Sequence, residues 1–250
     1  MITLESITKT YGDNTALDAI DLRISPGMTT VILGRSGCGK STILRTIIGL
    51  IEPDSGSVYI DGHILNPSNV YRLRQSMGYV IQEGGLFPHL TTERNISLMA
   101  RHLGRDSGWI ERRIAELCEL TKFPIEGLLR YPIQLSGGQR QRVSLMRALM
   151  LEPDILLLDE PLGALDPLIR YQLQVDLKSV FGTLNKTVVM VTHDLGEAGF
   201  LGDTVVLMED GSIVQQGTLT ELARTPAEPF VTEFINAQRN PLDVIGGDQD

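Results

Sequence analysis

Short apolar runs between polar breaks are the main pattern along this chain of 250 residues. Residues 28–33, 77–81, 155–158 and 188–191 are mostly apolar and have the length of one strand. Such runs predict buried strands, and the continuous Ile155 to Leu158 run is typical of a sheet covered on both faces. Residues 2–8 and 19–24 alternate between apolar and polar side chains, which predicts half-buried antiparallel strands. Turn residues also predict two hairpins, at 57–65 and 205–216.

Helical spacing is clearest in the middle of the chain. Ile110, Ile114, Leu117 and Cys118 form one stripe, so residues 109–120 are predicted to be a helix, as are residues 92–103. Further helices are expected at 42–50, 136–150, 167–184, 221–224 and 229–237. The alternation of strands and helices predicts an α/β domain over residues 1–240. Its core would comprise residues 1–90 and 150–240, with a helical subdomain at 91–149 and a flexible acidic tail at 241–250.

Composition places the chain among ordinary globular proteins, with 42% hydrophobic and 21% charged residues. A net charge of -9 argues against nucleic acid as a partner. The apolar runs are too short to cross a bilayer and the first residues do not resemble a signal peptide, so we expect a cytosolic location. Cys38 and Cys118 lack metal-site spacing and are expected to be reduced thiols.

The most specific motif follows the strand predicted at 28–33. It matches the phosphate-binding pattern G-x-x-x-x-G-K-[ST] at every position: Gly34, Arg35, Ser36, Gly37, Cys38, Gly39, Lys40 and Ser41. Its glycines let backbone amides face a phosphate, and the helix N-terminus adds positive partial charge. Lys40 would contact the terminal phosphates and Ser41 would bind Mg²⁺. A chance glycine-rich turn is the alternative, which the strand-loop-helix context disfavours.

Polar residues follow three other predicted strands. Gln82 follows the strand at 77–81, Asp159 and Glu160 follow 155–158, and His193 follows 188–191. Ligands bind at the carboxyl edge of such sheets, so these side chains are expected to gather near the phosphate-binding loop. The two acids could hold Mg²⁺ and orient a water molecule. A helix cap is the plainer role for Asp159, and His63, His89 and His102 have no comparable support.

A second glycine-rich helix start follows Leu135, with Ser136 as the expected N-cap of a helix that begins Gly137-Gly138-Gln139. Its open amides could bind a second anion, although an ordinary capped helix is the alternative. Because one ATP has a single polyphosphate, two such sites suggest a two-fold dimer in which each subunit completes the other's site. Tyr11 precedes a turn and could either stack on adenine or pack locally.

These motifs, in this order, resemble the ATPase subunit of ABC transporters from about residue 2 to residue 236. The resemblance implies a P-loop NTPase (RecA-like) core with an antiparallel β subdomain and an inserted helical signature subdomain. By this resemblance Tyr11 stacks on adenine, and residues Gly34 to Thr42 bind the phosphates of ATP. Ser41, Gln82 and Asp159 would serve Mg²⁺.

The same resemblance implies roles in catalysis and in the dimer. Glu160 would be the general base and His193 would sense the γ-phosphate, acting with Lys40 and Gln82. Asp166 would link the two active sites. The partner's ATP would be contacted by the signature residues Ser136, Gly138 and Gln139. Cys38 within the loop suggests that thiol alkylation inhibits and that ATP protects.

Residues 77–91 and 163–167 resemble the osmoprotectant branch of these importers, which carry glycine betaine, choline and related quaternary amines. This kinship implies a homodimer, or a pair with a related ATPase, on the cytoplasmic face of the membrane. Transmembrane permease subunits and, indirectly, a substrate-binding protein would be its partners. Many members of that branch carry regulatory CBS domains, which these 250 residues lack. Importers of other small solutes remain open.

Two other classes share the phosphate-binding motif. A soluble ABC ATPase of DNA repair or translation usually has two cassettes, a long coiled coil or basic surfaces, and none is visible in the sequence. A P-loop kinase would use Lys40 in a similar way but needs neither the Leu135 to Gln139 motif nor the Asp159-Glu160 pair. Stimulation by nucleic acid would favour the first class, and a phosphorylated small acceptor the second.

Overall fold

A computed structural model describes residues 1–82, 84–163 and 165–238. Glu83, in the loop predicted after residue 81, and Ala164, in the 163–167 motif, lie outside the described residues. The acidic tail predicted for residues 241–250 lies outside them as well.

The central sheet has six strands in the order β10 (Ser212–Gly217), β9 (Thr204–Glu209), β3 (Thr29–Gly34), β8 (Thr187–Thr192), β7 (Ile155–Asp159) and β6 (Met77–Val80). Strands β9, β3, β8, β7 and β6 run parallel, and β10 pairs with β9 in the antiparallel direction. Every residue of β3, β7 and β8 is buried, as expected for a sheet covered on both faces. The predicted α/β fold is therefore confirmed.

A second, antiparallel sheet has the order β2 (Asn14–Ile24), β1 (Ile2–Tyr11), β4 (Ser55–Ile60) and β5 (His63–Ile64). Helix α1 (Lys40–Ile47) lies between the two sheets. Its Ile43, Leu44 and Ile47 are fully buried in one cluster with Leu4 of β1 and Val189 of β8. This packing fixes α1, and with it the loop that precedes α1, against both sheets.

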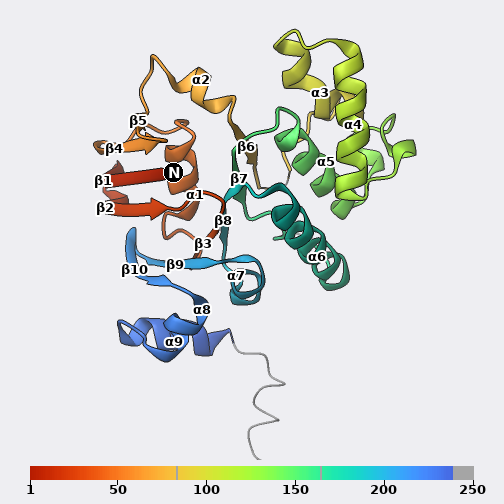
Figure 1. Cartoon of the computed structure of the whole chain (residues 1–250). Coiled ribbons are helices and arrows are strands. Elements are labelled where there is room, and N and C mark those ends of the chain that lie inside the picture. Colours follow the sequence, from red (N-terminus) through yellow and green to blue (C-terminus); the bar gives the residue numbers. More distant parts are fainter. Residues whose placement is uncertain (83, 164, 239–250) are drawn as a thin grey trace, which may run out of the picture.

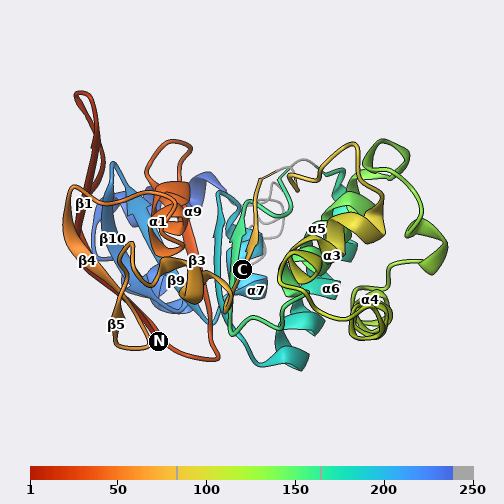
Figure 2. The ribbon, with the colours of Figure 1, turned by 90° about the horizontal axis from the view of Figure 1, so that it is seen from above.

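The middle of the chain forms a separate helical lobe, which Figure 2 shows beside the two sheets. It contains α3 (Thr92–His102), α4 (Ser107–Thr121) and α5 (Gly137–Leu149), with short 3-10 helices at Ile125–Gly127 and Pro132–Gln134. The helices predicted at 92–103 and 109–120 are present, and the stripe at Ile110, Ile114 and Leu117 is buried.

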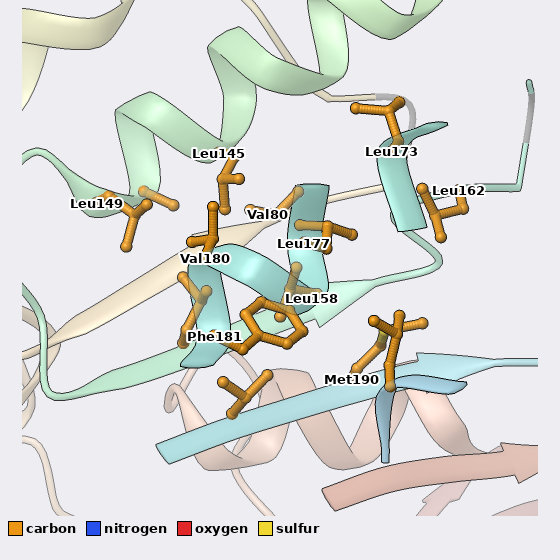
Figure 3. Packing of buried hydrophobic residues seen from close by; sticks show 14 of the residues in the cluster. Val80, Leu145, Leu149, Leu158, Leu162, Leu173, Leu177, Val180, Phe181 and Met190 are labelled. Atoms are coloured by element: carbon orange, nitrogen blue, oxygen red, sulfur yellow. The ribbon is translucent and has the colours of Figure 1, made fainter. Parts of the chain in front are cut away.

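Helix α6 (Pro167–Leu184) joins this lobe to the central sheet. Figure 3 shows its Leu173, Leu177 and Val180 packed between Leu145 of α5 and Leu158 of β7. A polar contact adds to this packing, because the buried Asp176 of α6 accepts hydrogen bonds from Lys122 at 2.8 Å and from Arg142 of α5 at 2.5 Å. Helix α6, the helical lobe and the central sheet thus share one core.

The described residues form four further helices: α2 (Val70–Arg74), α7 (Leu195–Leu201), α8 (Leu219–Arg224) and α9 (Pro229–Ala237). Helix α2 was not predicted, because none of its five residues is buried and so it lacks an apolar stripe. The two terminal helices were predicted. In the part of the chain that the structure describes, no helix combines the length and apolarity that crossing a membrane requires.

Candidate functional site

The phosphate-binding motif forms the turn between β3 and α1. Gly37 and Gly39 have φ values of 85° and 103°, in the left-handed region that favours glycine. A Cβ atom at Gly39 would lie 2.3 Å from the carbonyl oxygen of Ala16, so a larger residue would collide with β2. Gly39 is also the N-cap of α1 and provides no side chain to cap it. The first amides of α1 are therefore open to an anion.

Lys40 is buried at the base of this turn. Its Nζ donates hydrogen bonds to the carbonyl oxygens of Gly34 at 2.9 Å and Arg35 at 2.8 Å. Both partners are neutral backbone oxygens. A buried cation held only by carbonyls attracts an anion strongly. The loop thus fits the phosphates of a nucleotide.

Asp159, at the end of β7, faces the start of α1. Its Oδ1 accepts a hydrogen bond of 2.7 Å from the Ser41 hydroxyl, and its Oδ2 accepts one of 3.2 Å from Tyr79. Arg45 lies 3.8 Å from the same Oδ2. The side chain of Asp159 is only 1% exposed. The helix that follows β7 has Asp166 as its N-cap, so Asp159 does not have the capping role that the sequence left open. A hydroxyl oxygen next to a carboxylate oxygen provides ligands that suit Mg²⁺.

Glu160 lies at the centre of a second group of side chains. Its Oε2 is 3.5 Å from Nε2 of Gln82 and 3.5 Å from Nδ1 of His193. Glu160 has a φ of 43°, and its amide donates a hydrogen bond to Val191 of β8. Since its side chain is 18% exposed and that of His193 is 54% exposed, water reaches this group.

The predicted edge residues therefore form two neighbouring groups. Among the described residues, Ser41 and Asp159 are in direct contact, whereas Gln82 contacts Glu160 and forms no hydrogen bond with Ser41 or Asp159. The strands explain the arrangement, because β3, β8, β7 and β6 are adjacent and parallel and end at the same edge. The proximity of these side chains was predicted, but not their division into two groups.

The second glycine-rich motif begins α5 as a capping box. Ser136 Oγ accepts from the amide of Gln139, and the Gln139 side chain accepts from the amide of Ser136. This reciprocal cap leaves the amides of Gly137 and Gly138 without a capping side chain. Gly138 is buried, and a Cβ atom there would lie 2.7 Å from Ile169 Cγ2 of α6. A side chain at position 138 would therefore press against Ile169 of α6.

Helix α5 lies away from α1 in both views of the molecule, on the far side of the strands β6 and β7. Its first turn instead lines a hollow of about 240 Å³ with the loop that follows β7. Gly137 and Arg140 form one wall, and Glu160 and Gly163 the other. The two glycine-rich helix starts of one chain therefore do not form a single phosphate site.

Other predicted site residues have local contacts in the structure. Asp166 is the N-cap of α6 and accepts hydrogen bonds from the amides of Leu168 and Ile169. Tyr11, at the end of β1, is 49% exposed, and Lys9 Nζ lies 5.6 Å from its ring centroid. Their proposed contacts with a partner and with adenine remain predictions.

Cys38, whose alkylation is expected to inhibit, is buried in the structure. It is 6% exposed and belongs to the cluster around α1. Burial raises the pKa of its thiol, although the nearby Lys40 acts in the opposite direction. We therefore expect the fold to slow the alkylation that the sequence suggests, which remains a prediction.

Sequence reasoning missed the contacts of Tyr79 and Arg45 with Asp159. A signal existed for Arg45, because it follows Ser41 by four positions and so lies on the same face of α1. Tyr79 lies in a strand next to β7, but which residue of β7 it meets depends on the register of the sheet. The side-chain contacts of Arg35 with α9 were missed as well.

Comparison with known proteins decides the family. A family model described as ABC transporter matches residues 17–163, which contain the phosphate-binding loop, the capped start of α5 and the Asp159-Glu160 pair. The chain belongs to the ABC transporter family. The resemblance to this family, drawn from the motifs, is thus confirmed.

Individual relatives agree with this assignment. The glycine betaine/carnitine/choline transport ATP-binding protein OpuCA of Bacillus subtilis is 47% identical over 240 residues, which are 96% of this chain and 63% of that protein. This chain therefore spans less than two thirds of that relative's length. The probable sulfate/thiosulfate import ATP-binding protein CysA of Chlorella vulgaris is 43% identical over 94% of this chain and 98% of its own.

A solved structure has the same fold. The ATP-binding cassette MJ0796, described as a dimer in a post-hydrolysis state bound to ADP and Pi, superposes with a TM-score of 0.79. It is 35% identical in sequence, and the match covers 88% of this chain and 99% of that one. The ABC cassette fold of this chain is therefore supported by sequence and by structure.

Proposed function

We propose that this chain binds ATP with Mg²⁺ and hydrolyses it, as the ATP-binding subunit of an ABC importer. The observation that carries the proposal is the contact between Ser41 and Asp159 next to the group formed by Glu160, Gln82 and His193. One edge of the sheet thereby brings a phosphate-binding loop, a cation-binding pair and a carboxylate accessible to water together.

Each group has a distinct task in this proposal. Lys40 and the first amides of α1 bind the phosphates, and Ser41 with Asp159 holds Mg²⁺, which neutralises phosphate charge when bound. Glu160 accepts a proton from the attacking water. Gln82 and His193, both 3.5 Å from Glu160 Oε2, orient that carboxylate and the water beside it.

A second copy of the chain would complete each site. The amides of Gly137 and Gly138 are left open by the cap of α5, and α5 lies away from the α1 of its own chain. In a two-fold dimer they would bind the phosphates held by the partner, with Ser136 and Gln139 shaping the helix start. The dimeric MJ0796 relative, with ADP and Pi, supports this arrangement.

Transport is the proposed use of the ATPase. The name of the OpuCA relative supports an importer of glycine betaine, carnitine or choline, with permease subunits in the membrane and this chain at their cytoplasmic face. A substrate-binding protein would be an indirect partner of this chain. The CysA relative is nearly as similar and is named for sulfate and thiosulfate, so another small solute is the second candidate.

Measurements of nucleotide binding and hydrolysis test the proposed ATPase activity. The parent is expected to bind a fluorescent ATP analogue and to hydrolyse ATP only with Mg²⁺, and Lys40→Met is expected to lose both. Lys186→Met, which removes the same charge from a lysine beside Asp154 on the protein surface, is the control and should retain both. Equal hydrolysis by the parent and Lys40→Met would contradict the proposal.

Co-purification tests the proposed role in an importer. The tagged chain is recovered from its native membranes in mild detergent and its companions are identified by mass spectrometry. A polytopic membrane protein in fixed stoichiometry is expected, and the accompanying binding protein is then screened with quaternary amines and with sulfate. Recovery with ribosomes or DNA-repair proteins instead would contradict the importer assignment.

A further inference from the structure

The side chain of Arg35 leaves the phosphate-binding loop and lies against α9, almost two hundred residues further along the chain. Its Nη2 is 3.3 Å from Oε1 of Glu233, and its guanidinium carbon is 5.3 Å from the ring centroid of Phe230. Phe230 and Glu233 are three positions apart, so they share one face of α9. A planar guanidinium can make an ion pair and a cation-π contact together.

The backbone carbonyl of Arg35, in contrast, makes its contacts within the loop. Its carbonyl oxygen accepts a hydrogen bond of 2.8 Å from Lys40 Nζ and a longer one of 3.4 Å from the amide of Cys38. One residue therefore joins α9 to the lysine that the proposed function assigns to phosphate binding.

Helix α9 also contacts the loop after β8. The side-chain oxygen of Gln238, at the end of α9, accepts a hydrogen bond of 2.7 Å from the amide of Leu195. Leu195 follows His193 by two positions and is the first residue of α7. Val231 and Phe234 hold α9 in place, because both are buried in the core that contains β9 and α7.

We infer that Glu233 and Phe230 are positioning residues that fix the phosphate-binding loop through Arg35 and thereby set the affinity for nucleotide. The inference rests on the proposed function. The contact touches neither Glu160 nor Asp159, so its loss should weaken nucleotide binding and leave the hydrolytic step almost unchanged. The terminal helix is then a part of the nucleotide site and not only of its scaffold.

Glu233→Gln tests this role, with Glu228→Gln as the matched control. Glu228 precedes α9 and carries the same charge, but its side chain does not cap the helix. The dissociation constant of N-methylanthraniloyl-ATP is expected to rise about two- to five-fold in Glu233→Gln, the range for an exposed ion pair. KM for ATP should rise equally, with kcat within about a factor of 1.5 of the parent by the same reasoning.

A second experiment tests whether the effect of Glu233 on nucleotide binding depends on Arg35. In Arg35→Ala, the further change Glu233→Gln should have no effect on the dissociation constant, because the partner of Glu233 is already absent. The inference is wrong if Glu233→Gln and Glu228→Gln bind nucleotide equally. It is also wrong if Glu233→Gln raises the dissociation constant as much in the Arg35→Ala background as in the parent. Failure of the parent itself to bind nucleotide would instead contradict the proposed function.

Discussion

The Ser41 hydroxyl donates a hydrogen bond of 2.7 Å to Oδ1 of Asp159, a residue 118 positions further along the chain. The first lies at the start of α1 and the second at the end of β7, and the parallel sheet brings the two together. Tyr79 and Arg45 approach the other carboxylate oxygen. These contacts together hold the orientation of the Asp159 carboxylate.

Asp159→Asn is expected to lower Mg²⁺-dependent ATP hydrolysis by about 100-fold or more, since a metal ion provides several kcal/mol of charge stabilisation. The substitution keeps the shape of the side chain and an oxygen for Ser41. Hydrolysis is measured against Mg²⁺ concentration, and the half-saturating concentration should rise. Asp154→Asn, at a carboxylate on the protein surface beside Lys186, is the control. An unchanged Mg²⁺ dependence in Asp159→Asn would contradict the assignment.

Much of the fold follows from short-range patterns in the sequence. The apolar runs at 155–158 and 188–191 became fully buried strands, and the predicted N-cap Ser136 caps α5. The position of Gln82, Asp159 and His193 directly after strands was sufficient to place them at one edge. These features depend on residues that are neighbours in the chain.

Contacts between distant elements could not be predicted. The division of the edge into an Asp159 group and a Glu160 group depends on strand register and on the positive φ of Glu160. The ion pair between Arg35 and Glu233 joins opposite ends of the chain. The burial of Cys38 depends on α1 packing between two sheets, which no local pattern around the motif reveals.

Gly138→Ala is expected to destabilise the protein by about 1 to 3 kcal/mol, because the new methyl group would lie within 2.7 Å of Ile169 Cγ2. Thermal unfolding followed by circular dichroism measures the loss, and Ile169→Ala should reduce the effect of Gly138→Ala. Gly182→Ala is the control, since a Cβ there meets no atom within 4 Å and the change should stabilise α6. Equal melting temperatures for Gly138→Ala and the parent would show that the contact is relaxed at no cost.

Cys38 is expected to react slowly with N-ethylmaleimide in the folded protein. Burial raises the pKa of the thiol and so lowers the fraction of reactive thiolate at pH 7, and access is also restricted. In a Cys118→Ser background, labelling should be at least about ten-fold slower than in denaturant and should accelerate as the pH rises. Rapid labelling at pH 7 would mean that the loop opens readily in solution.

Glu197→Gln is expected to stabilise the protein at neutral pH. Burial raises the pKa of the Glu197 carboxyl, which accepts a hydrogen bond of 2.6 Å from Thr192. Its contribution to stability is therefore complete below the ordinary value of 4.5 and is lost as the pH rises through the raised pKa. The variant should melt about 2 to 4 °C above the parent at pH 8, with a smaller difference at pH 5.

An exposed glutamate provides the control for that experiment. Glu111 of α4 is exposed, and Glu111→Gln should change the melting temperature little at either pH. If Glu197→Gln melts below the parent at pH 8, the ionised carboxylate stabilises the folded protein. The prediction that its burial is destabilising would then be wrong.

The most direct test of the proposed function is ATP turnover by Glu160→Gln, measured together with its association state by analytical ultracentrifugation. This substitution removes the proposed base but leaves Lys40, Ser41 and Asp159 in place. We expect ATP binding to persist, hydrolysis to fall by at least about 100-fold, and ATP to convert monomers into a stable dimer. Hydrolysis by Glu160→Gln at the rate of the parent, without an ATP-dependent dimer, would contradict the account.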